Sequence, residues 1–302
     1  MKIFHSELSS NPGHFSFGYS VYGLFENTDS LSHVYEQGFL PAMIVPETPN
    51  LFYMTRGTRV VVPEFKELHK LGRVARKIES LPNVRIVTHQ KEQFQITEKF
   101  LDFCLQYFTF RHGKDSMPKE RLVGILKSPY LSHITEYSID GETVAYTLEV
   151  QSEDFIHAWY YAYSSTYEGK HLGAYLLLDV TRRAKNANKK YVYLGITHGP
   201  WMQYKTIYQP LEYWNGREWV HDPKSEKLKN LLAADPHRVL TLTDEWRGER
   251  ESFYSTPHAY SKQTLILRRL EEALARYPKT LATVMVIATL CFAAFALVPA
   301  LF

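Results

Sequence analysis

Alternating apolar and polar positions predict a sheet in the middle of the chain. Residues 131–139 and 143–150 alternate in this way, and Asp140-Gly141 between them is a signal for a tight hairpin turn. A third strand, a helix and a fourth strand are predicted at residues 155–164, 174–185 and 191–195. The order β-β-β-α-β predicts an antiparallel sheet that leads into a βαβ unit, and therefore a fold of the α/β or α+β class.

Upstream of this sheet the pattern predicts shorter elements. We expect one or two strands within residues 15–27 and helices at residues 29–39, 66–81 and 96–113. A further strand is expected at residues 59–65, where Pro63 ends it. The helix at 96–113 has an apolar stripe that includes Cys104, which we expect in the core.

The end of the chain carries its longest uncharged stretch. Residues 280–302 contain no charged side chain, and a helix of this length spans roughly the ~30 Å hydrocarbon core of a membrane. Lys and Arg precede it, so the positive-inside rule predicts a single-pass membrane protein with a cytoplasmic N-terminal domain. The N-terminus lacks the apolar run of a signal peptide. Residues 262–279 predict a juxtamembrane helix that lies either on the membrane surface or on the main domain.

Four regions are therefore expected along the chain. They are an N-terminal region at 1–90, a transferase domain at 91–222, a linker with the juxtamembrane helix at 223–279 and a membrane-spanning helix at 280–302.

Composition narrows the function classes. The hydrophobic content of 45% is enough for a sizeable core, and the net charge of +3 allows a local phosphate-binding patch without requiring one. Two cysteines, Cys104 and Cys291, cannot build a disulfide framework or a four-ligand metal site. Cysteines this few indicate a reducing compartment. The histidines have no metal-ligand spacing, so we expect no metal.

The segment after the last predicted strand carries the candidate chemistry. Gly195 ends the strand, and Tyr204, Lys205 and Tyr208 follow within a few residues. Tyrosines donate hydrogen bonds to a developing oxyanion or stack on bases, and a lysine binds phosphate as a point charge. In the alternative interpretation both tyrosines belong to the core and Lys205 is a surface charge.

The predicted element order resembles that of the GNAT acyltransferases. In those proteins a glycine-containing turn and the following helix N-terminus bind the pyrophosphate of acetyl-CoA. Here the turn reads Lys170-His171-Leu172-Gly173-Ala174, with fewer glycines than the usual pattern and no Arg or Gln in the first position. The resemblance implies a GNAT-like fold with a smaller N-terminal region.

The sequence also resembles the arginyl- and leucyl-tRNA–protein transferases. The matching blocks are Tyr193-Leu194-Gly195, Gly199-Pro200, Met202-x-Tyr204-Lys205 and Tyr208-x-Pro210-Leu211-Glu212. Upstream, residues 159–178 and the segments LFEN, YEQGF and RVVVPEFKELHKLGRVARK are similar to that family, so residues 14 to about 219 align in order. The chain departs from the family at its N-terminal cysteines, whose positions hold residues such as His14, Ser16, Met54 and Thr55.

This resemblance implies an activity and a set of site residues. The reaction would move an aminoacyl group, of Arg or Leu type, from aminoacyl-tRNA to an amino group of a protein or peptide, with no other cofactor. The catalytic candidates are Tyr204, Lys205 and His198, with His198 as proton acceptor. Replacing Lys205 with Ala is expected to abolish transfer at little cost in thermal stability. The substrate-binding candidates are Tyr208, Tyr160, Tyr161, Glu136, Gly195 and Gly173, and Glu212 is a second candidate for holding the acceptor amine.

A basic run supports a tRNA partner. Between Arg56 and Lys77 there are seven Lys or Arg residues against two Glu. Phosphate contacts by such residues make binding salt-dependent. In the alternative interpretation these Lys and Arg residues form only the solvent-exposed face of a helix. The tRNA-binding candidates are Arg59, Lys70, Arg73, Arg76 and Lys77.

Two other function classes stay open. A CoA-dependent N-acyltransferase would use acetyl-CoA as its donor, and a non-catalytic module would bind tRNA or protein N-termini. The membrane tail adds a further possibility for the acceptor, which is either a protein, a peptide or an amino lipid. The sequence does not fix the transferred amino acid or the oligomeric state.

Overall fold

The computed structural model describes residues 1–6, 20–26, 29–42, 48–114 and 116–235. The chain divides into two compact units, Met1–Leu240 and Thr241–Phe302, and the second lies entirely outside the described residues. The predicted juxtamembrane helix and membrane span therefore fall outside them as well, and so do His14 and Ser16. Within the described part of the chain, no helix combines the length and the apolar character needed to cross a bilayer.

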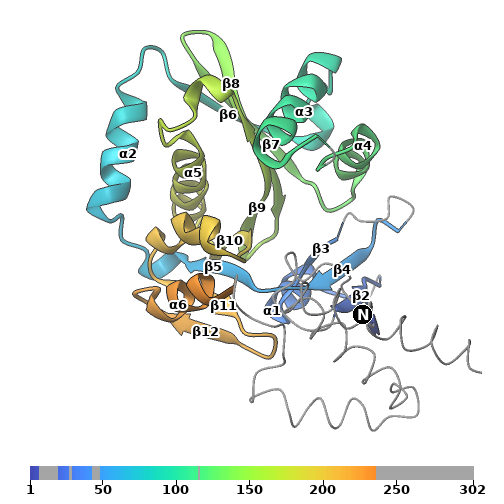
Figure 1. Ribbon diagram of the computed structural model, residues 1–302. Coiled ribbons are helices and arrows are strands. Elements are labelled where there is room, and N and C mark those ends of the chain that lie inside the picture. Colours follow the sequence, from blue (N-terminus) through green and yellow to red (C-terminus); the bar gives the residue numbers. More distant parts are fainter. Residues whose placement is uncertain (7–19, 27–28, 43–47, 115, 236–302) are drawn as a thin grey trace, which may run out of the picture. The chain divides into compact units, whose positions relative to one another are not determined.

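One large sheet forms the centre of the first unit (Figure 1). Its strands run in the order β12-β11-β5-β10-β9-β8-β7-β6. Their bounds are β5 Gly57–Val61, β6 Arg85–Gln90, β7 His133–Ile139, β8 Glu142–Gln151, β9 Phe155–Tyr163, β10 Tyr191–Ile196, β11 Leu211–Trp214 and β12 Trp219–Asp222. Strands β5 and β6 come before the boundary predicted at residue 90 and the other six strands come after it, so the sheet draws on both of the predicted regions.

The predicted β-β-β-α-β order is confirmed by β7, β8, β9, helix α5 (Leu172–Asn186) and β10. Asp140 and Gly141 have φ angles of 51° and 82°, as the tight turn between β7 and β8 requires. The pair β9–β10 is parallel, and the other pairings of this sheet are antiparallel. The fold is therefore mixed α+β.

Helices cover both faces of the sheet (Figure 1). Helices α2 (His69–Glu79) and α5 pack on one face, where Leu71, Leu176 and Val192 are buried together. On the other face, α3 (Glu98–His112) and α4 (Lys119–Lys127) share a core with Leu148 and Ala162. The helices expected at 66–81 and 96–113 thus form, and Cys104 is buried in α3 as predicted. Burial raises the pKa of the Cys104 thiol to about 12, so it stays protonated.

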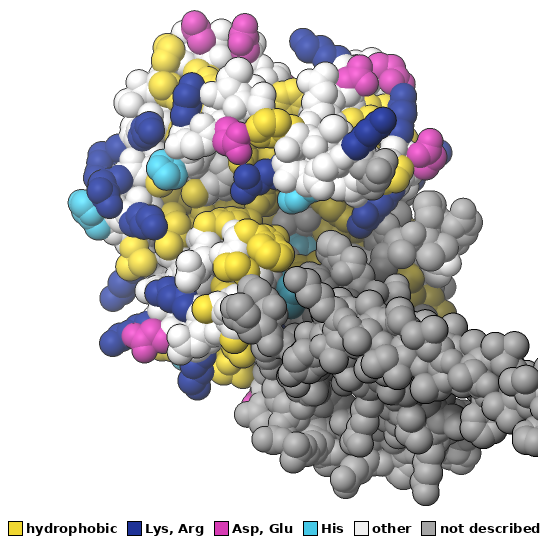
Figure 2. Space-filling model, viewed as in Figure 1, with side chains coloured by type: hydrophobic (Ala, Val, Ile, Leu, Met, Phe, Trp, Pro, Cys, Tyr) yellow, Lys and Arg dark blue, Asp and Glu magenta, His cyan; other side chains and the backbone are white. Residues whose placement is uncertain are grey.

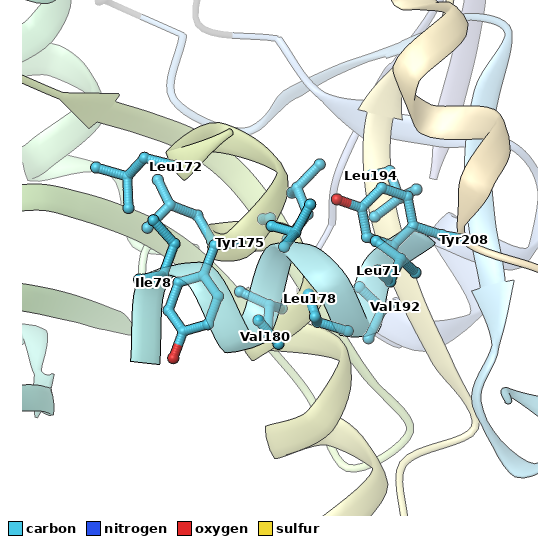
Figure 3. Packing of buried hydrophobic residues seen from close by; sticks show 14 of the residues in the cluster. Leu71, Ile78, Leu172, Tyr175, Leu178, Val180, Val192, Leu194 and Tyr208 are labelled. Atoms are coloured by element: carbon cyan, nitrogen blue, oxygen red, sulfur yellow. The ribbon is translucent and has the colours of Figure 1, made fainter. Parts of the chain in front are cut away.

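The core under α2 and α5 reaches the segment that follows β10 (Figure 3). Leu71 of α2 lies near Leu194 of β10 and Tyr208, whereas Ile78 lies at the other end of the same cluster, beside Tyr175 of α5. The apolar residues of α2 recur at helical spacing and form one buried stripe, while its Lys and Arg side chains are exposed. This spacing explains why a segment rich in Lys and Arg forms a helix here.

A second, four-stranded sheet is built by the N-terminal residues, in the order β1-β2-β4-β3. Its strands and the adjoining helix are β1 Lys2–Ser6, β2 Ser20–Leu24, α1 Leu31–Glu36, β3 Phe39–Pro41 and β4 Leu51–Met54. Tyr35 and Phe52 pack against Phe155 and Tyr193 of the large sheet, so one apolar cluster joins the two sheets.

The region predicted as a linker contains regular structure at its start. Helix α6 (Glu226–Ala234) lies in it and buries Leu228 and Leu232 against Leu211 and Tyr213, whereas strand β12, which precedes the predicted linker, pairs with β11. The strand predicted at 59–65 ends at Val61, and Pro63 lies in the 3-10 helix η2 (Val62–Glu64). Two further 3-10 helices are η3 (Lys91–Gln93) and η4 (Ser165–Tyr167).

A buried ion pair ties α5 to the sheet. Glu149 on β8 is fully buried, and Arg183 on α5 donates to its Oε1 at 2.6 Å. Thr135, Thr147 and Gln151 also donate to this carboxylate. Burial opposes the ionised form most strongly, but the charge of Arg183 and the hydrogen bonds from Arg183, Thr147 and Gln151 together outweigh burial and lower the pKa of Glu149.

We predict that Arg183→Met destabilises the protein by about 3–5 kcal/mol, because it leaves the Glu149 carboxylate buried without its cation. Urea unfolding measures the change. The matched control is the neighbouring Arg182→Met, which removes partly exposed ion pairs with Glu67 and Glu79. The control should lose less than about 1 kcal/mol. Equal losses in the two variants would contradict this account.

Candidate active site

A cleft opens where two strands of the large sheet separate. The parallel strands β9 and β10 pair at three positions, the last being Tyr193 with His157. Beyond this point β9 continues to Tyr163 and β10 to Ile196 without pairing to each other. The cleft has a volume of 1130 Å³, and β9, β10, α3, the start of α5 and the 3-10 helix η5 (Pro200–Ile207) contribute to its walls.

The cleft wall is strongly aromatic. Ten lining side chains are Tyr, Phe or Trp, and Trp201 among them is 61% exposed. Figure 2 shows hydrophobic side chains in the middle of the described surface, with Lys and Arg side chains around them. Glu168 is the one carboxylate among the described lining residues, whereas Arg111, Arg121 and Lys205 supply cations. Such a wall suits a ligand that has flat rings and negative charge.

Two tyrosine hydroxyls meet in the cleft. Tyr161 on β9 and Tyr204 on η5 are 2.6 Å apart, oxygen to oxygen. Burial raises the pKa of both phenols, that of Tyr204 well above its usual range. Both hydroxyls therefore stay protonated at neutral pH. One of the two hydrogens makes the mutual bond, which leaves the second for a ligand.

Lys205 occupies the end of β10. Its side chain is buried, and its Nζ donates to the carbonyl oxygens of Leu194 at 2.7 Å and Ile196 at 2.5 Å. These carbonyls lie beyond the last β9–β10 pair, so the lysine satisfies backbone groups at the point where the strands part. Burial lowers the pKa of Lys205 to about 7. Its replacement is therefore expected to change stability, contrary to the expectation from the sequence.

His157 is a site residue that the sequence did not single out. It lines the cleft at the last position where β9 pairs with β10, and its Nδ1 lies 2.9 Å from the Tyr35 hydroxyl. Burial, with a smaller contribution from the nearby Lys205, lowers its pKa to about 3, so the imidazole is neutral. Gly195, with φ of +76°, lies beside it, and a Cβ there would stand 3.5 Å from Nε2.

Six of the predicted site residues come together in the cleft. Tyr204, Lys205, Tyr160, Tyr161, Gly173 and Gly195 all line it.

Tyr208 lies elsewhere, in the core below α5. It is fully buried among apolar side chains (Figure 3). Its hydroxyl donates to the Ala174 carbonyl oxygen at 2.6 Å. Tyr208 therefore supports the start of α5 instead of lining the cleft.

His198 and Glu136 also lie away from the cleft lining. His198 is buried, with its Nδ1 3.4 Å from Asp235 Oδ2. Asp235 also receives Arg56 Nη1 at 2.8 Å and the backbone N–H of Gly199 at 2.8 Å. His198 thus helps to fix the loop before η5 and drops out of the catalytic set. Glu136 accepts a hydrogen bond from Thr143 on the adjacent strand β8, far along the sheet from β10.

The tRNA-binding candidates separate into two groups. Arg59 is buried, and its guanidinium donates to Glu212 at 2.7 Å and stacks over Tyr191. Because Arg59 and Glu212 pair with each other, we no longer propose Arg59 for tRNA binding or Glu212 for holding the acceptor amine. Lys70, Arg73, Arg76 and Lys77 are exposed on α2, which lies on the sheet face opposite α3 and α4.

No group of three or more His, Cys, Asp or Glu side chains among the described residues is arranged to hold a metal ion.

Comparison with known proteins connects this cleft to one enzyme family. Residues 92–215 match the family model described as arginine-tRNA-protein transferase, C terminus. The match spans α3, α4, β7 to β11 and η5, which together build most of the cleft. Residues 92–215 are a domain of the aminoacyltransferase family. The resemblance noted from the sequence is thus confirmed for this part of the chain.

Curated relatives of this aminoacyltransferase domain are distant in sequence. The chain is 29% identical over 154 residues to an aspartate/glutamate leucyltransferase of Maricaulis maris. This alignment covers 46% of this chain and 58% of the relative. It is 27% identical over 194 residues to the enzyme of the same name from Cereibacter sphaeroides, covering 59% and 67% of the two chains. The first alignment thus spans little more than half of the relative's length.

Solved structures resemble this chain only weakly. A C-terminal domain of a putative lysylphosphatidylglycerol synthetase from Agrobacterium fabrum has a TM-score of 0.38 at 12% identity, covering 59% of this chain and 54% of that one. FemX has a TM-score of 0.37 at 8% identity, covering 57% and 60%. Likeness of this size adds nothing to the family assignment.

We predict that the stability of the wild type, relative to Lys205→Met, increases between pH 7 and pH 10. The folded pKa of Lys205 is lowered from 10.5 to about 7, so in this window the unfolded chain binds a proton that the folded chain does not. Stability increases with pH wherever the unfolded state binds more protons, and it stops changing below the folded pKa. Urea unfolding at pH 7, 8 and 9 measures the difference. Lys170→Met, which removes an exposed lysine, is the control. A difference that falls with pH would refute the burial of this lysine.

Proposed function

We propose that the protein transfers an aminoacyl group, of Arg or Leu type, from aminoacyl-tRNA to an amino group of a protein or peptide. One observation carries the proposal. The segment that matches the transferase family, residues 92–215, surrounds the cleft and contributes the hydroxyl pair Tyr161–Tyr204 and the buried Lys205. Membrane attachment through residues 280–302, with the catalytic unit on the cytoplasmic side, belongs to the proposal as an inference from the sequence.

The chemistry needs no covalent intermediate, because the aminoacyl ester of tRNA is already activated. The acceptor nitrogen attacks the ester carbonyl carbon, the bond to the ribose oxygen breaks, and an amide forms. A proton leaves the nitrogen and a proton reaches the ribose oxygen. The site has to align amine and ester, receive the proton and stabilise the oxyanion.

Lys205 fits the role of proton acceptor. A neutral lysine has two N–H donors and one lone pair, and its two donors match the two carbonyls of Leu194 and Ile196. The lone pair then serves as the base. A pKa of about 7 places the exchange of this proton near neutral pH, where a general base works best.

The tyrosine pair fits the role of oxyanion donor. The spare hydrogen of Tyr161 and Tyr204 is held in a buried setting, where a hydrogen bond to developing charge is strengthened. The remaining aromatic side chains of the wall, with the exposed Trp201, suit stacking of the terminal bases of tRNA.

The direct test incubates the full-length protein in detergent micelles with a mixture of radiolabelled aminoacyl-tRNAs and a set of peptides with free N-termini. We expect label on the peptides and a single donor amino acid. Acetyl-CoA is supplied as a parallel donor. Transfer from acetyl-CoA alone would replace the proposal with an N-acyltransferase, and binding of tRNA without transfer from either donor would indicate a non-catalytic module.

A pair of tyrosine variants separates catalysis from folding. We predict that Tyr204→Phe lowers kcat by about 100-fold, since it removes an oxyanion donor, with little change in the KM for aminoacyl-tRNA. Tyr208→Phe is the matched control, because it removes only the bond to the Ala174 carbonyl. The control should lose about 1 kcal/mol of unfolding free energy and keep its kcat within twofold. Full activity of Tyr204→Phe would exclude the role given to the pair.

A further inference from the structure

One nitrogen of the His157 ring is buried at the cleft without a partner. The side chain is 1% exposed, and its Nε2 has no hydrogen-bond partner among the described residues. The other nitrogen, Nδ1, lies 2.9 Å from the hydroxyl of Tyr35, which does not line the cleft. The unpartnered edge of the ring is therefore the one that a ligand meets. Because buried polar atoms of folded proteins nearly always have a partner, we expect a ligand to supply it.

The Tyr35 hydroxyl determines which ring nitrogen carries the hydrogen. This phenol is fully buried, and burial raises its pKa well above the usual range, so it keeps its proton. Nδ1 of His157 is its one hydrogen-bond partner in the described part of the chain. The buried hydroxyl needs an acceptor, and Nδ1 accepts only when the hydrogen of the neutral ring is on Nε2. His157 therefore directs an N–H donor at the cleft, and the partner of this donor has to be an acceptor atom.

Gly195 places this donor next to Lys205. A Cβ at Gly195 would stand 3.5 Å from Nε2, so the absence of a side chain leaves space beside the nitrogen. The carbonyl oxygens on either side of Gly195, those of Leu194 and Ile196, hold the Lys205 amine. The imidazole donor and the proposed base thus flank one residue of β10, just beyond the last pairing of β9 with β10.

The imidazole serves a different group of the substrates than the hydroxyl pair does. Tyr161 and Tyr204 pack against the core under α2 and α5, whereas His157 contacts Tyr35 in the cluster that joins the two sheets. With the ester oxygen at the hydroxyl pair, the imidazole is left for the acceptor. An acceptor amine beside Lys205 has the carbonyl oxygen of its own residue roughly 3 Å away, by standard backbone geometry. That oxygen is an acceptor atom within reach of Nε2.

We propose that the Nε2–H of His157 binds the main-chain carbonyl oxygen of the acceptor's first residue and, together with Lys205, positions the acceptor amine for attack. The inference rests on the proposed aminoacyl transfer and adds a binding residue for its acceptor. Tyr35 is then a positioning residue, because it acts on the acceptor only through the tautomer of His157.

The test takes the peptide that the full-length protein in detergent micelles modifies best, and an analogue whose first carbonyl oxygen is replaced by sulfur. Sulfur accepts hydrogen bonds more weakly than oxygen. We therefore expect kcat/KM for the amide peptide to exceed that for the thioamide by about 5- to 10-fold, the range of one hydrogen bond. His157→Phe should reduce this ratio to about 1 and leave the KM for aminoacyl-tRNA unchanged. His157→Gln, which keeps an N–H donor, should restore part of the ratio.

Further variants separate binding from folding. His157→Phe leaves the Tyr35 hydroxyl buried without an acceptor, whereas the double variant Tyr35→Phe/His157→Phe removes both polar partners and should recover the Tm. The double variant should still lack the preference for the amide peptide. Tyr35→Phe alone should lower the ratio although its side chain does not line the cleft. His112→Phe is the matched control, because it removes another histidine of the cleft lining, and it should keep the wild-type ratio.

Nitrogen NMR of the protein labelled at its histidines determines the tautomer without any substrate. We expect the signals of His157, identified by their loss in His157→Gln, to show a protonated Nε2 and an unprotonated Nδ1 at neutral pH. The opposite tautomer would overturn the proposal, because Nε2 would then be an acceptor.

Four results of the other measurements would overturn it as well. If the wild type uses both peptides equally, the first carbonyl is not bound although transfer stands. If His157→Phe lowers both peptides by the same factor, the imidazole acts on the ester instead of the acceptor. A collapsed Tm in the double variant as well as in His157→Phe would make the histidine structural. If the wild type modifies no peptide, the proposed transfer fails, and this inference fails with it.

Discussion

The parting of β9 and β10 is the constraint on which the rest of the structure depends. Two parallel strands that separate inside a sheet expose backbone carbonyls in a place that water reaches poorly, and such groups are costly without partners. Lys205 supplies the partners for Leu194 and Ile196. The same contacts keep its amine buried and its pKa near 7. The group that stabilises the gap is therefore also the group whose proton affinity suits chemistry in the gap.

The two sheets contribute differently to this arrangement. The segment that matches the transferase family forms most of the cleft. Residues outside that segment pack against the strands that carry the cleft. Tyr35, next to the N-terminal sheet, contacts His157, and β5 pairs with β10 on the side away from the cleft. The N-terminal region also contributes Leu40, Pro41 and Tyr53 to the lining of the cleft.

The sequence predicted the central elements because their signals are local. Alternation along β7 to β9, the turn at Asp140-Gly141 and the helical spacing of α5 all follow from neighbouring residues. Helix α4 was missed because it has only nine residues, with Gly124 inside it. Burial across the fold could not be predicted in the same way. Lys205 and Tyr208 are three residues apart in one motif, yet only the packed structure places the first in the cleft and the second in the core.

The contacts of the Asp235 carboxylate determine where the chain can be shortened. This carboxylate stands at the end of α6 and holds both Arg56 and the Gly199 amide, at the loop that leads into η5. Asp235, the last residue that the structure describes, thus holds the loop before η5 in place. A truncation that removes the C-terminal segment has to end beyond Asp235. One that stops at α6 would remove the contacts of Asp235 and release the loop, so its effect could not be attributed to loss of the segment that follows.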